Sequence, residues 1–548
     1  MMHARPPELR RRGGRVAGAI LRMRTRPLSR LPSTATGALR DRSGSVATIF
    51  AVAMVPVLIA AGVGIDIARA TSSRTALQDA IDATALAVAH LPASTSQDDL
   101  EAKALLWLNA NLNNSALQNV QLDAALTNGE AVLTATAAVP TTLTAIAGFP
   151  TVPVKAASTV KWGLGHVEVA LVLDNTGSMS GTKLSRLKAA AADLVTALSD
   201  STDSNDPNAL KISVVPFAAA VKVGSTYRGQ TWLKGAAPKQ YFEDNDLRND
   251  LFNQKKQQNR FTLMDQINTA WGGCVESRPA PYDIDDTGPI SSKPQSYFVP
   301  YFAPDEPDNN TIESGSWWPQ YFTFPNNYLS DGTTGTNNWE DRQGRKQKYT
   351  GAPGNGGGPN KGCDMQSLVR LTTNMTTVKD KIAAMNATGN TNIPIGLMWG
   401  WHTLSPNQPF ADGAAYDDPD TKKFVVLLTD GDNVNDATNN SNRSSYSALG
   451  YIWQKRLMGT DGVTPLDENS SASQRTAAMD ARMLAACTNM KAKGVTVYTV
   501  RIDLSGSAST ALRECATTPD MYYDIDSSGL GAAFSNIAGS IGRLRIAN

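Results

Sequence analysis

The first long apolar segment of the chain lies near its N-terminus. Residues 46–65 (VATIFAVAMVPVLIAAGVGI) contain no charged side chain. A helix of about 20 residues spans the roughly 30 Å hydrocarbon core of a bilayer, and a proline such as Pro56 is tolerated in such a helix. A cleaved secretory signal is the alternative, but its apolar part is usually only about 7–15 residues long. The pattern therefore predicts a transmembrane helix over residues 46–66.

The pattern changes between residues 67 and 163. Residues 68–91 lack glycine and proline, so the helix is predicted to continue beyond the membrane. Residues 101–112 are typical of a second helix. Residues 131–139 and 151–160 alternate small apolar and polar side chains, as half-buried strands do. We expect a pilin-like α+β stalk over residues 67–163, in which the long helix packs on a small antiparallel sheet.

From residue 164 to residue 548 the chain alternates nearly continuous apolar runs with amphipathic segments. The apolar runs are residues 167–174, 211–217, 423–430 and 495–502, and the predicted helices are residues 184–198, 474–494 and 529–546. Such runs are typical of strands buried on both faces, and their alternation with helices predicts a doubly wound, Rossmann-like parallel α/β sheet. Ligands bind beyond the carboxyl ends of such strands, where Asp174 and Asp430 lie.

The stretch LVLDNTGSMSGTK, residues 171–183, follows the first of these strands and admits three kinds of site. A phosphate-binding P-loop requires GxxxxGK[ST], but the glycine and lysine here are not adjacent. A serine hydrolase requires GxSxG and a histidine base. No serine of the stretch has glycines at that spacing, and only His166 and His402 lie in the sheet region. Both enzymatic interpretations are disfavoured, and we expect no catalytic residue.

The third kind of site binds a metal. Asp174, Thr176 and Ser178 alternate along the predicted loop, so their oxygens can converge on one point. Mg²⁺ prefers octahedral oxygen ligands at about 2.0–2.1 Å and keeps several waters. Hydroxyls with one or two carboxylates meet this demand and leave one coordination position open. The simpler alternative is that the aspartates only cap backbone amides, without a metal.

This pattern resembles the metal-ion-dependent adhesion site (MIDAS) of von Willebrand factor A (VWA) domains, whose motif is DxSxS with a distant threonine and aspartate. Asp174-x-Thr176-x-Ser178 matches with threonine in place of the first serine. By the same resemblance, TNIPIGL places Thr391 at the site and LLTDG places Asp430 there. The resemblance implies a VWA-like domain that binds a divalent metal, Mg²⁺ with Mn²⁺ or Ca²⁺ as alternatives, and an acidic group of a partner.

The N-terminal segment resembles a second family. SGSVATIFAVAMVPVLIAAGVGIDIARATSSRTALQDAIDATALAVA is similar to the start of TadE/TadG-like proteins of the tight-adherence (Tad/Flp) pilus assembly system. The shared features are the small-residue start, the apolar span, the GIDIARA exit and the LQDAIDATALA helix. Pilin-type precursors cut after a glycine usually carry glutamate five residues later, but the residue five positions after Gly44 is Ile49. The resemblance therefore points to the uncleaved, TadG-like branch.

The distribution of charge predicts the orientation in the membrane. Residues 1–42 contain eleven arginines and no lysine, and Asp66 follows the apolar span. The positive-inside rule then places an arm, residues 1–45, in the cytoplasm and the remainder of the chain in the periplasm. This role explains the basic arm, so nucleic acid is not an expected partner.

The four cysteines all follow the apolar span, and their spacing matches no zinc motif. Four cysteines permit three pairings. Cys487 and Cys515 flank one predicted strand, whereas Cys274 and Cys363 lie in the middle and at the close of a long insertion. These positions favour the pairs Cys487–Cys515 and Cys274–Cys363.

The insertion, at about residues 221–362, is rich in aromatic residues, proline and glycine. Disordered segments are poor in aromatic residues, so we expect this one to be ordered. It can pack on the surface of its own domain or form a cap that faces a partner, because Trp, Tyr and Arg dominate binding hot spots. The sequence leaves both alternatives open. Its segment WGGCVESRPAPYD is also similar to one in VWA-bearing TadG-like proteins.

Together these features predict a single-pass protein of the bacterial inner membrane with a periplasmic VWA-like domain. It is expected to serve Tad/Flp pilus assembly by binding other pilus or envelope proteins, not by catalysis. An envelope adhesin or scaffold unrelated to pili is the alternative. An enzyme is the third alternative, and turnover of phosphoesters or acyl esters by the purified periplasmic domain would support it.

Overall fold

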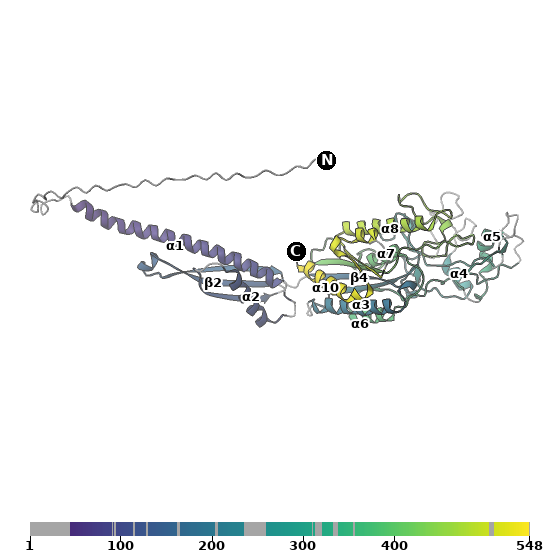
Figure 1. Ribbon diagram of the computed structural model, residues 1–548, viewed down its shortest axis with the longest axis horizontal. Coiled ribbons are helices and arrows are strands. Elements are labelled where there is room, and N and C mark those ends of the chain that lie inside the picture. Colours follow the sequence, from purple (N-terminus) through teal and green to yellow (C-terminus); the bar gives the residue numbers. More distant parts are fainter. Residues whose placement is uncertain are drawn as a thin grey trace, which may run out of the picture. The chain divides into compact units, whose positions relative to one another are not determined.

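The computed structural model describes residues 44–546 with internal gaps (Figure 1). The gaps are residue 90 and residues 92–94, 113–115, 128–129, 162–164, 203–205, 235–258, 309–310, 313–320, 333–337, 355–356 and 504–508. The predicted cytoplasmic arm up to residue 43 and most of the aromatic stretch SWWPQYF lie outside the described residues.

Helix α1, Gly44–Ala89, is continuous through Pro56. Its first half is apolar and exposed, with Phe50 61% and Val52 73% accessible. Among the described residues, this is the one helix long and apolar enough to cross a membrane. The predicted apolar helix and its continuation beyond residue 66 are confirmed.

Two compact units can be distinguished. One joins the chain up to residue 70 with residues 140–152, and the other joins residues 71–139 with residues 153–548. The first unit contains the apolar half of α1 and the loop that ends in β3. The second contains the remaining elements.

The second half of α1 packs on a small sheet of order β1-β2-β3, in which β1 and β2 are antiparallel. The elements here are α2 (Gln97–Asn111), β1 (Gln118–Thr127), β2 (Glu130–Pro140) and β3 (Thr151–Lys161). Side chains along β2 alternate between buried and partly exposed, as predicted. On α1, Leu77, Ile81 and Val88 are fully buried, and Gln78 donates a hydrogen bond to the carbonyl of Ala157 on β3. The expected packing of the long helix on a small sheet is therefore confirmed.

The larger sheet is doubly wound, as predicted. Its six main strands are β4 (His166–Asp174), β5 (Leu210–Phe217), β10 (Val369–Thr372), β11 (Thr421–Thr429), β12 (Thr496–Ile502) and β13 (Tyr522–Ile525). They lie in the order β10-β5-β4-β11-β12-β13, all parallel except β10. Two strands of two residues each, β6 (Val221–Lys222) and β7 (Cys274–Val275), extend the sheet from β5 and pair antiparallel. When the six main strands are numbered by their order in the chain, the sheet order is 3-2-1-4-5-6, so the direction of winding reverses between β4 and β11. Such a reversal opens a crevice at the carboxyl ends of these two strands.

Helices cover both faces of this sheet (Figure 1). They are α3 (Thr182–Asp200), α6 (Met375–Ala384) and α10 (Leu530–Ile546) on one face, and α7 (Ile393–Leu404), α8 (Ala472–Ala492) and α9 (Thr510–Cys515) on the other. Along β4, Val169 and Leu171 pack with the first set, and Ala170 and Val172 with the second. Both faces of the strand are thus buried, which explains its continuous apolar sequence.

Helix α7 lies unusually close to the sheet because of two glycines one turn apart. A Cβ atom at Gly396 would lie 2.5 Å from the ring of Phe217, and one at Gly400 would lie 2.4 Å from Val172. Larger residues at these positions would push α7 away. The close packing fixes the N-terminal end of α7 beside the carboxyl end of β4.

The insertion packs on its own domain. Its elements are β6 (Val221–Lys222), α4 (Arg260–Gln266), β7 (Cys274–Val275), β8 (Thr311–Ile312), β9 (Tyr321–Phe322) and α5 (Trp339–Gln343). Trp232, Trp271, Phe298 and Tyr301 are each at most 3% exposed and belong to the same core as α7. These described aromatic side chains form core, which supports the first of the two alternatives for them.

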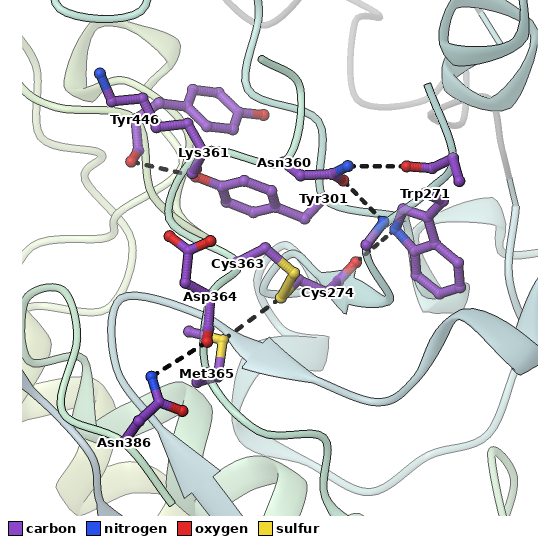
Figure 2. Close-up of a disulfide and its surroundings, with 12 residues drawn as sticks. Trp271, Cys274, Tyr301, Asn360, Lys361, Cys363, Asp364, Met365, Asn386 and Tyr446 are labelled. Carbon is purple, nitrogen blue, oxygen red and sulfur yellow. Dashed lines mark hydrogen bonds between the residues drawn. A yellow bond between two sulfur atoms is a disulfide. The ribbon is translucent and has the colours of Figure 1, made fainter. Parts of the chain in front are cut away.

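Both predicted disulfides are confirmed, Cys274–Cys363 in the insertion and Cys487–Cys515 between α8 and α9. Figure 2 shows the first one beside Trp271, whose indole N–H donates to the carbonyl of Cys274 at 2.9 Å. Asn360 accepts from the backbone N–H of Gly272 at 2.8 Å. The disulfide and the hydrogen bond to Asn360 join the middle of the insertion to its close.

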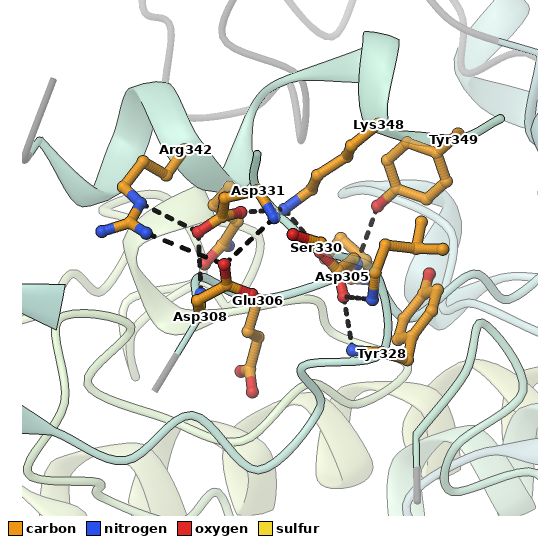
Figure 3. Close-up of polar contacts among 12 residues, drawn as sticks. Asp305, Glu306, Asp308, Tyr328, Ser330, Asp331, Arg342, Lys348 and Tyr349 are labelled. Carbon is orange, nitrogen blue, oxygen red and sulfur yellow. Dashed lines mark hydrogen bonds and ion pairs between the residues drawn. The ribbon is translucent and has the colours of Figure 1, made fainter. Parts of the chain in front are cut away.

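A buried charge cluster holds another part of the insertion (Figure 3). Lys348 pairs with Asp305 at 2.6 Å and with Asp331 at 3.1 Å, and Arg342 pairs with Asp331 at 2.8 Å. The backbone N–H of Asp308 donates to Asp331 at 2.8 Å, and that of Asp331 donates to Asp308 at 3.2 Å. With three carboxylates and two cations already paired, the cluster is a structural element of the insertion.

Candidate metal centre

Asp174 is the last residue of β4 and is completely buried. Its Oδ1 accepts a hydrogen bond from the backbone N–H of Thr176 at 2.8 Å, and its Oδ2 accepts one from the hydroxyl of Thr429 at 2.6 Å. Thr429 ends β11, and the parallel register places it level with Asp174. The two central strands therefore fix the orientation of this carboxylate.

Asp430 follows β11 directly and is 2% exposed. Its Oδ1 accepts from the hydroxyl of Ser178 at 2.6 Å, and its Oδ2 accepts from the ammonium group of Lys183 at 2.6 Å. The hydroxyls of Thr176 and Ser178 are 3.0 Å apart. These contacts bring four of the five predicted site residues to the crevice between β4 and β11.

Thr391, the fifth predicted residue, precedes α7 and is also buried. A Cβ atom at Gly431 would lie 3.3 Å from its Oγ1 and 4.0 Å from the Oγ of Ser178, so both hydroxyls border the same glycine. The backbone N–H of Gly177 donates to the carbonyl of Gly389 at 2.9 Å. This bond joins the loop after β4 to the loop before α7. All five predicted residues are thus neighbours.

The site contains two buried carboxylates, of which Asp430 is paired with Lys183. The pKa of Asp174 is raised to about 6, mainly by burial and to a smaller extent by the negative charge of Asp430. A cation beside the two carboxylates would reverse both effects. The site offers only oxygen ligands, which are two carboxylates and three hydroxyls. Among the described residues, no group of three or more His, Cys, Asp or Glu side chains is placed to hold a metal. The donors present therefore fit a hard cation such as Mg²⁺ and not zinc in a cysteine–histidine site.

Neither described histidine of the sheet region is placed to act as a base at Ser178. His166 begins β4, about 26 Å from the carboxyl end at 3.3 Å per residue, and pairs with Asp206 at 2.9 Å. His402 lies in the last turn of α7, buried against Phe298 and Trp399. Neither of these two histidines can therefore serve as the base that a serine hydrolase requires.

Two polar residues of the site were not identified from the sequence. Thr429 orients Asp174, and its position directly before Asp430 was the available signal. Lys183 lies in the first turn of α3 and places its ammonium group on Asp430. The glycine before this helix, Gly181, has φ +79°, a left-handed conformation that lets the loop turn into α3. The lysine at the second position of the helix can therefore reach back to Asp430.

Comparison with protein families identifies the first segment of the chain. Residues 44–91 match the family described as "Putative Flp pilus-assembly TadE/G-like". The N-terminal segment is TadE/G-like. The match covers the helix α1 of the TadE/G-like segment and ends before α2. No curated protein matches the chain.

Several solved structures resemble the chain at low identity. The vWF domain of the type V pili tip protein Mfa5 from Porphyromonas gingivalis is 12% identical, with a TM-score of 0.32, over 70% of this chain and 97% of that one. The pilus adhesin SpaC from Lactobacillus rhamnosus GG is 12% identical, with a TM-score of 0.31, over 79% of this chain and 35% of that one. Proximal thread matrix protein 1 from the mussel byssus, "with zinc occupied MIDAS motif", is 13% identical, with a TM-score of 0.28, over 69% and 48%.

This chain therefore spans about a third to a half of the length of the last two proteins. The doubly wound fold of the domain that follows the TadE/G-like segment is shown by its own strand order, β10-β5-β4-β11-β12-β13.

Proposed function

We propose that the chain is a component of Tad/Flp pilus assembly that binds other proteins through a metal-ion-dependent site on a VWA-like domain. The observation that carries this proposal is the convergence of Asp174, Thr176, Ser178, Thr391 and Asp430 at the crevice between β4 and β11. The TadE/G-like segment supplies the link to pili. Binding is favoured over catalysis because the site offers carboxylates and hydroxyls held by one another.

A divalent cation, Mg²⁺ or alternatively Mn²⁺ or Ca²⁺, would be held by these five side chains directly or through water. The bound ion would supply a coordination position for an acidic group of a partner protein. The chain's own residues orient that position. Thr429 and the backbone of Thr176 fix Asp174, whereas Ser178 is exposed and borders the solvent side of the pocket.

The same proposal includes the location of the protein. The apolar half of α1 would anchor it in the bacterial inner membrane, with the arginine-rich arm in the cytoplasm and the VWA-like domain in the periplasm. The proposed limits are residues 1–45 for the arm, 46–66 for the membrane helix, 67–163 for the stalk, 164–548 for the VWA-like domain and 221–362 for its insertion.

The test is a crosslinking pull-down of the full-length protein from native membranes, with and without EDTA. Capture of pilus components that is lost in EDTA supports the proposal. Equal capture in EDTA contradicts a metal-dependent contact. Metal-dependent capture of envelope proteins outside the pilus system favours the alternative, an adhesin or scaffold unrelated to pili.

A further inference from the structure

A loop of the smaller unit is attached to the end of the apolar helix. Asp66 of α1 accepts hydrogen bonds from the backbone N–H groups of Thr142, Leu143 and Thr144 at 3.1, 3.0 and 2.9 Å. The hydroxyl of Thr144 donates to the same carboxylate at 2.7 Å. One carboxylate thus satisfies four donors of the loop, including those that begin the short helix η1, Thr144–Ala147. The height of the loop along α1 is fixed by this contact.

The loop also reaches the apolar span itself. Leu143 packs directly on Gly62, where a Cβ atom would lie 2.5 Å from the Cβ of Leu143. Gly62 lies four residues before Asp66, about 6 Å further along the helix into its uncharged stretch. The absence of a side chain at Gly62 therefore lets the loop approach the segment that is expected to cross the bilayer.

The side chains that the loop presents outward are apolar. Ile146 is 81% exposed, Phe149 is 65% exposed and Leu143 is 40% exposed. Residues 131–154 contain no charged side chain. On α1 beside the loop, Ile65 and Ile67 are also more than half exposed. Large exposed apolar groups are unfavourable in water, and here they adjoin the apolar surface of α1.

We propose that the loop over residues 141–150 is a second membrane contact, which inserts Ile146, Phe149 and part of Leu143 into the lipid leaflet from which α1 emerges. Interfacial segments bury apolar side chains about 5–10 Å deep at the boundary between headgroups and acyl chains. The contact at Gly62 places the loop at this depth, and the hydrogen bonds to Asp66 hold it there. The stalk would then be tethered to the membrane at two points, which restricts its tilt.

Lipid is favoured over a protein as the occupant because the exposed side chains continue the exposed surface of a helix that is itself apolar from residue 46 to residue 65. The loop itself contains no charged residue, and the cation that contacts it, Arg69, lies on α1 and donates to the hydroxyl of Thr142 at 2.8 Å. The inference rests on the membrane anchor of the proposed function, but not on the metal site.

The test uses full-length protein in nanodiscs of phosphatidylethanolamine and phosphatidylglycerol. Single cysteines at Ile146 or Phe149 carry a nitroxide spin label, and the four native cysteines are paired in disulfides and do not react. Collision rates with oxygen, which concentrates in lipid, and with a water-soluble nickel chelate report depth. Labels at Phe50 in α1 and at Val463, which is 78% exposed in the larger domain, are the lipid and water controls.

Labels at Ile146 and Phe149 should resemble the label at Phe50, with shielding from nickel at least several-fold stronger than at Val463. If both labels are as accessible to nickel as Val463 while Phe50 stays shielded, the loop contact is wrong and the anchor stands. If Phe50 is also accessible to nickel, both the anchor and the loop contact are wrong.

Discussion

The hydroxyl of Ser178 donates a hydrogen bond of 2.6 Å to Asp430, a residue 252 positions later in the chain. Ser178 belongs to the loop after β4, and Asp430 directly follows the neighbouring strand β11. The two strands lie side by side because the sheet reverses its order between them. A contact that defines the candidate metal centre is therefore a direct consequence of the sheet topology.

The first prediction concerns Asp174. Replacement Asp174→Asn removes the charge but keeps the shape, so divalent binding should be lost. The metal-free protein should unfold at an equal or higher temperature, because a buried charge and its repulsion with Asp430 disappear. Isothermal titration with Mg²⁺ and Mn²⁺ measures the first effect, and thermal unfolding in EDTA measures the second. Unchanged binding would mean that the loop only caps backbone amides.

The second prediction separates a ligand from a packing residue at Thr176. Its hydroxyl lies 3.0 Å from that of Ser178, and its side chain is buried. Thr176→Ser keeps the oxygen and should bind divalent ions within about twofold of the wild type. Thr176→Val keeps the shape without the oxygen and should weaken binding by at least about tenfold, on the scale of one lost ligand or hydrogen bond. Equal affinities in the two variants would exclude the hydroxyl from the site.

Lys183 provides the third prediction. Its ammonium group is 2.6 Å from Asp430, so a divalent ion must share this carboxylate with it or displace it. Lys183→Met should therefore tighten divalent binding, by up to about fivefold if the pair contributes up to about 1 kcal/mol as partly exposed pairs do. Lys188→Met is the matched control on the same helix, because Lys188 donates to the carbonyl of Ala383 instead. Weaker binding in Lys183→Met than in the control would refute the competition.

The long strands of the larger sheet could be predicted because each is buried on both faces, which leaves a continuous apolar run in the sequence. Strands β10 and β13 could not, since each has four residues and several of them are only partly buried. The small elements of the insertion were also missed. Long-range packing of Trp232, Phe298 and similar residues stabilises them, and that packing leaves no regular period in the sequence.

The candidate site was predicted through the resemblance to the adhesion-site motif, and the structure brings its five residues together. The motif contains the ligands but not the groups that orient them, so Thr429 and Lys183 could not be predicted from it. Their roles depend on strand register and on the start of α3, which require the three-dimensional arrangement. The cysteine pairs could be predicted because Cys487 and Cys515 flank one strand and Cys274 and Cys363 both lie in the insertion.

The fourth prediction concerns a buried charge network that joins the insertion to the domain. Glu276 pairs with Arg456 at 2.6 Å and with Arg260 at 2.5 Å. Although burial opposes its ionisation, these two cations hold the pKa of Glu276 below its usual value. Glu276→Gln should lower the free energy of unfolding by about 3–5 kcal/mol, because two buried guanidinium groups lose their counter-charge.

The control for Glu276 is Asp265→Asn, which breaks the pair of Asp265 with Arg228 at 2.6 Å on the surface. Both side chains of this pair are more than a third exposed, so the expected loss is below about 1 kcal/mol. Chemical denaturation followed by circular dichroism compares the two variants. Similar losses in both would show that the network around Glu276 contributes no more than a surface pair.

The last prediction concerns pH and His402. Burial lowers the pKa of His402 well below 6.5, and the charge of Arg278 lowers it further, so the folded domain holds the imidazole neutral between Phe298 and Trp399. Below pH 6.5 the histidine binds a proton in the unfolded chain but not in the folded chain. The free energy of unfolding should therefore fall by about 2 kcal/mol between pH 7 and pH 5. His402→Leu should remove this part of the acid sensitivity, although it lowers stability at pH 7 through altered packing. Thermal unfolding of both proteins at pH 7, 6 and 5 isolates the effect, since all other titrating groups are shared. Parallel losses of stability on acidification would show that His402 is protonated in the folded domain as readily as in the unfolded chain.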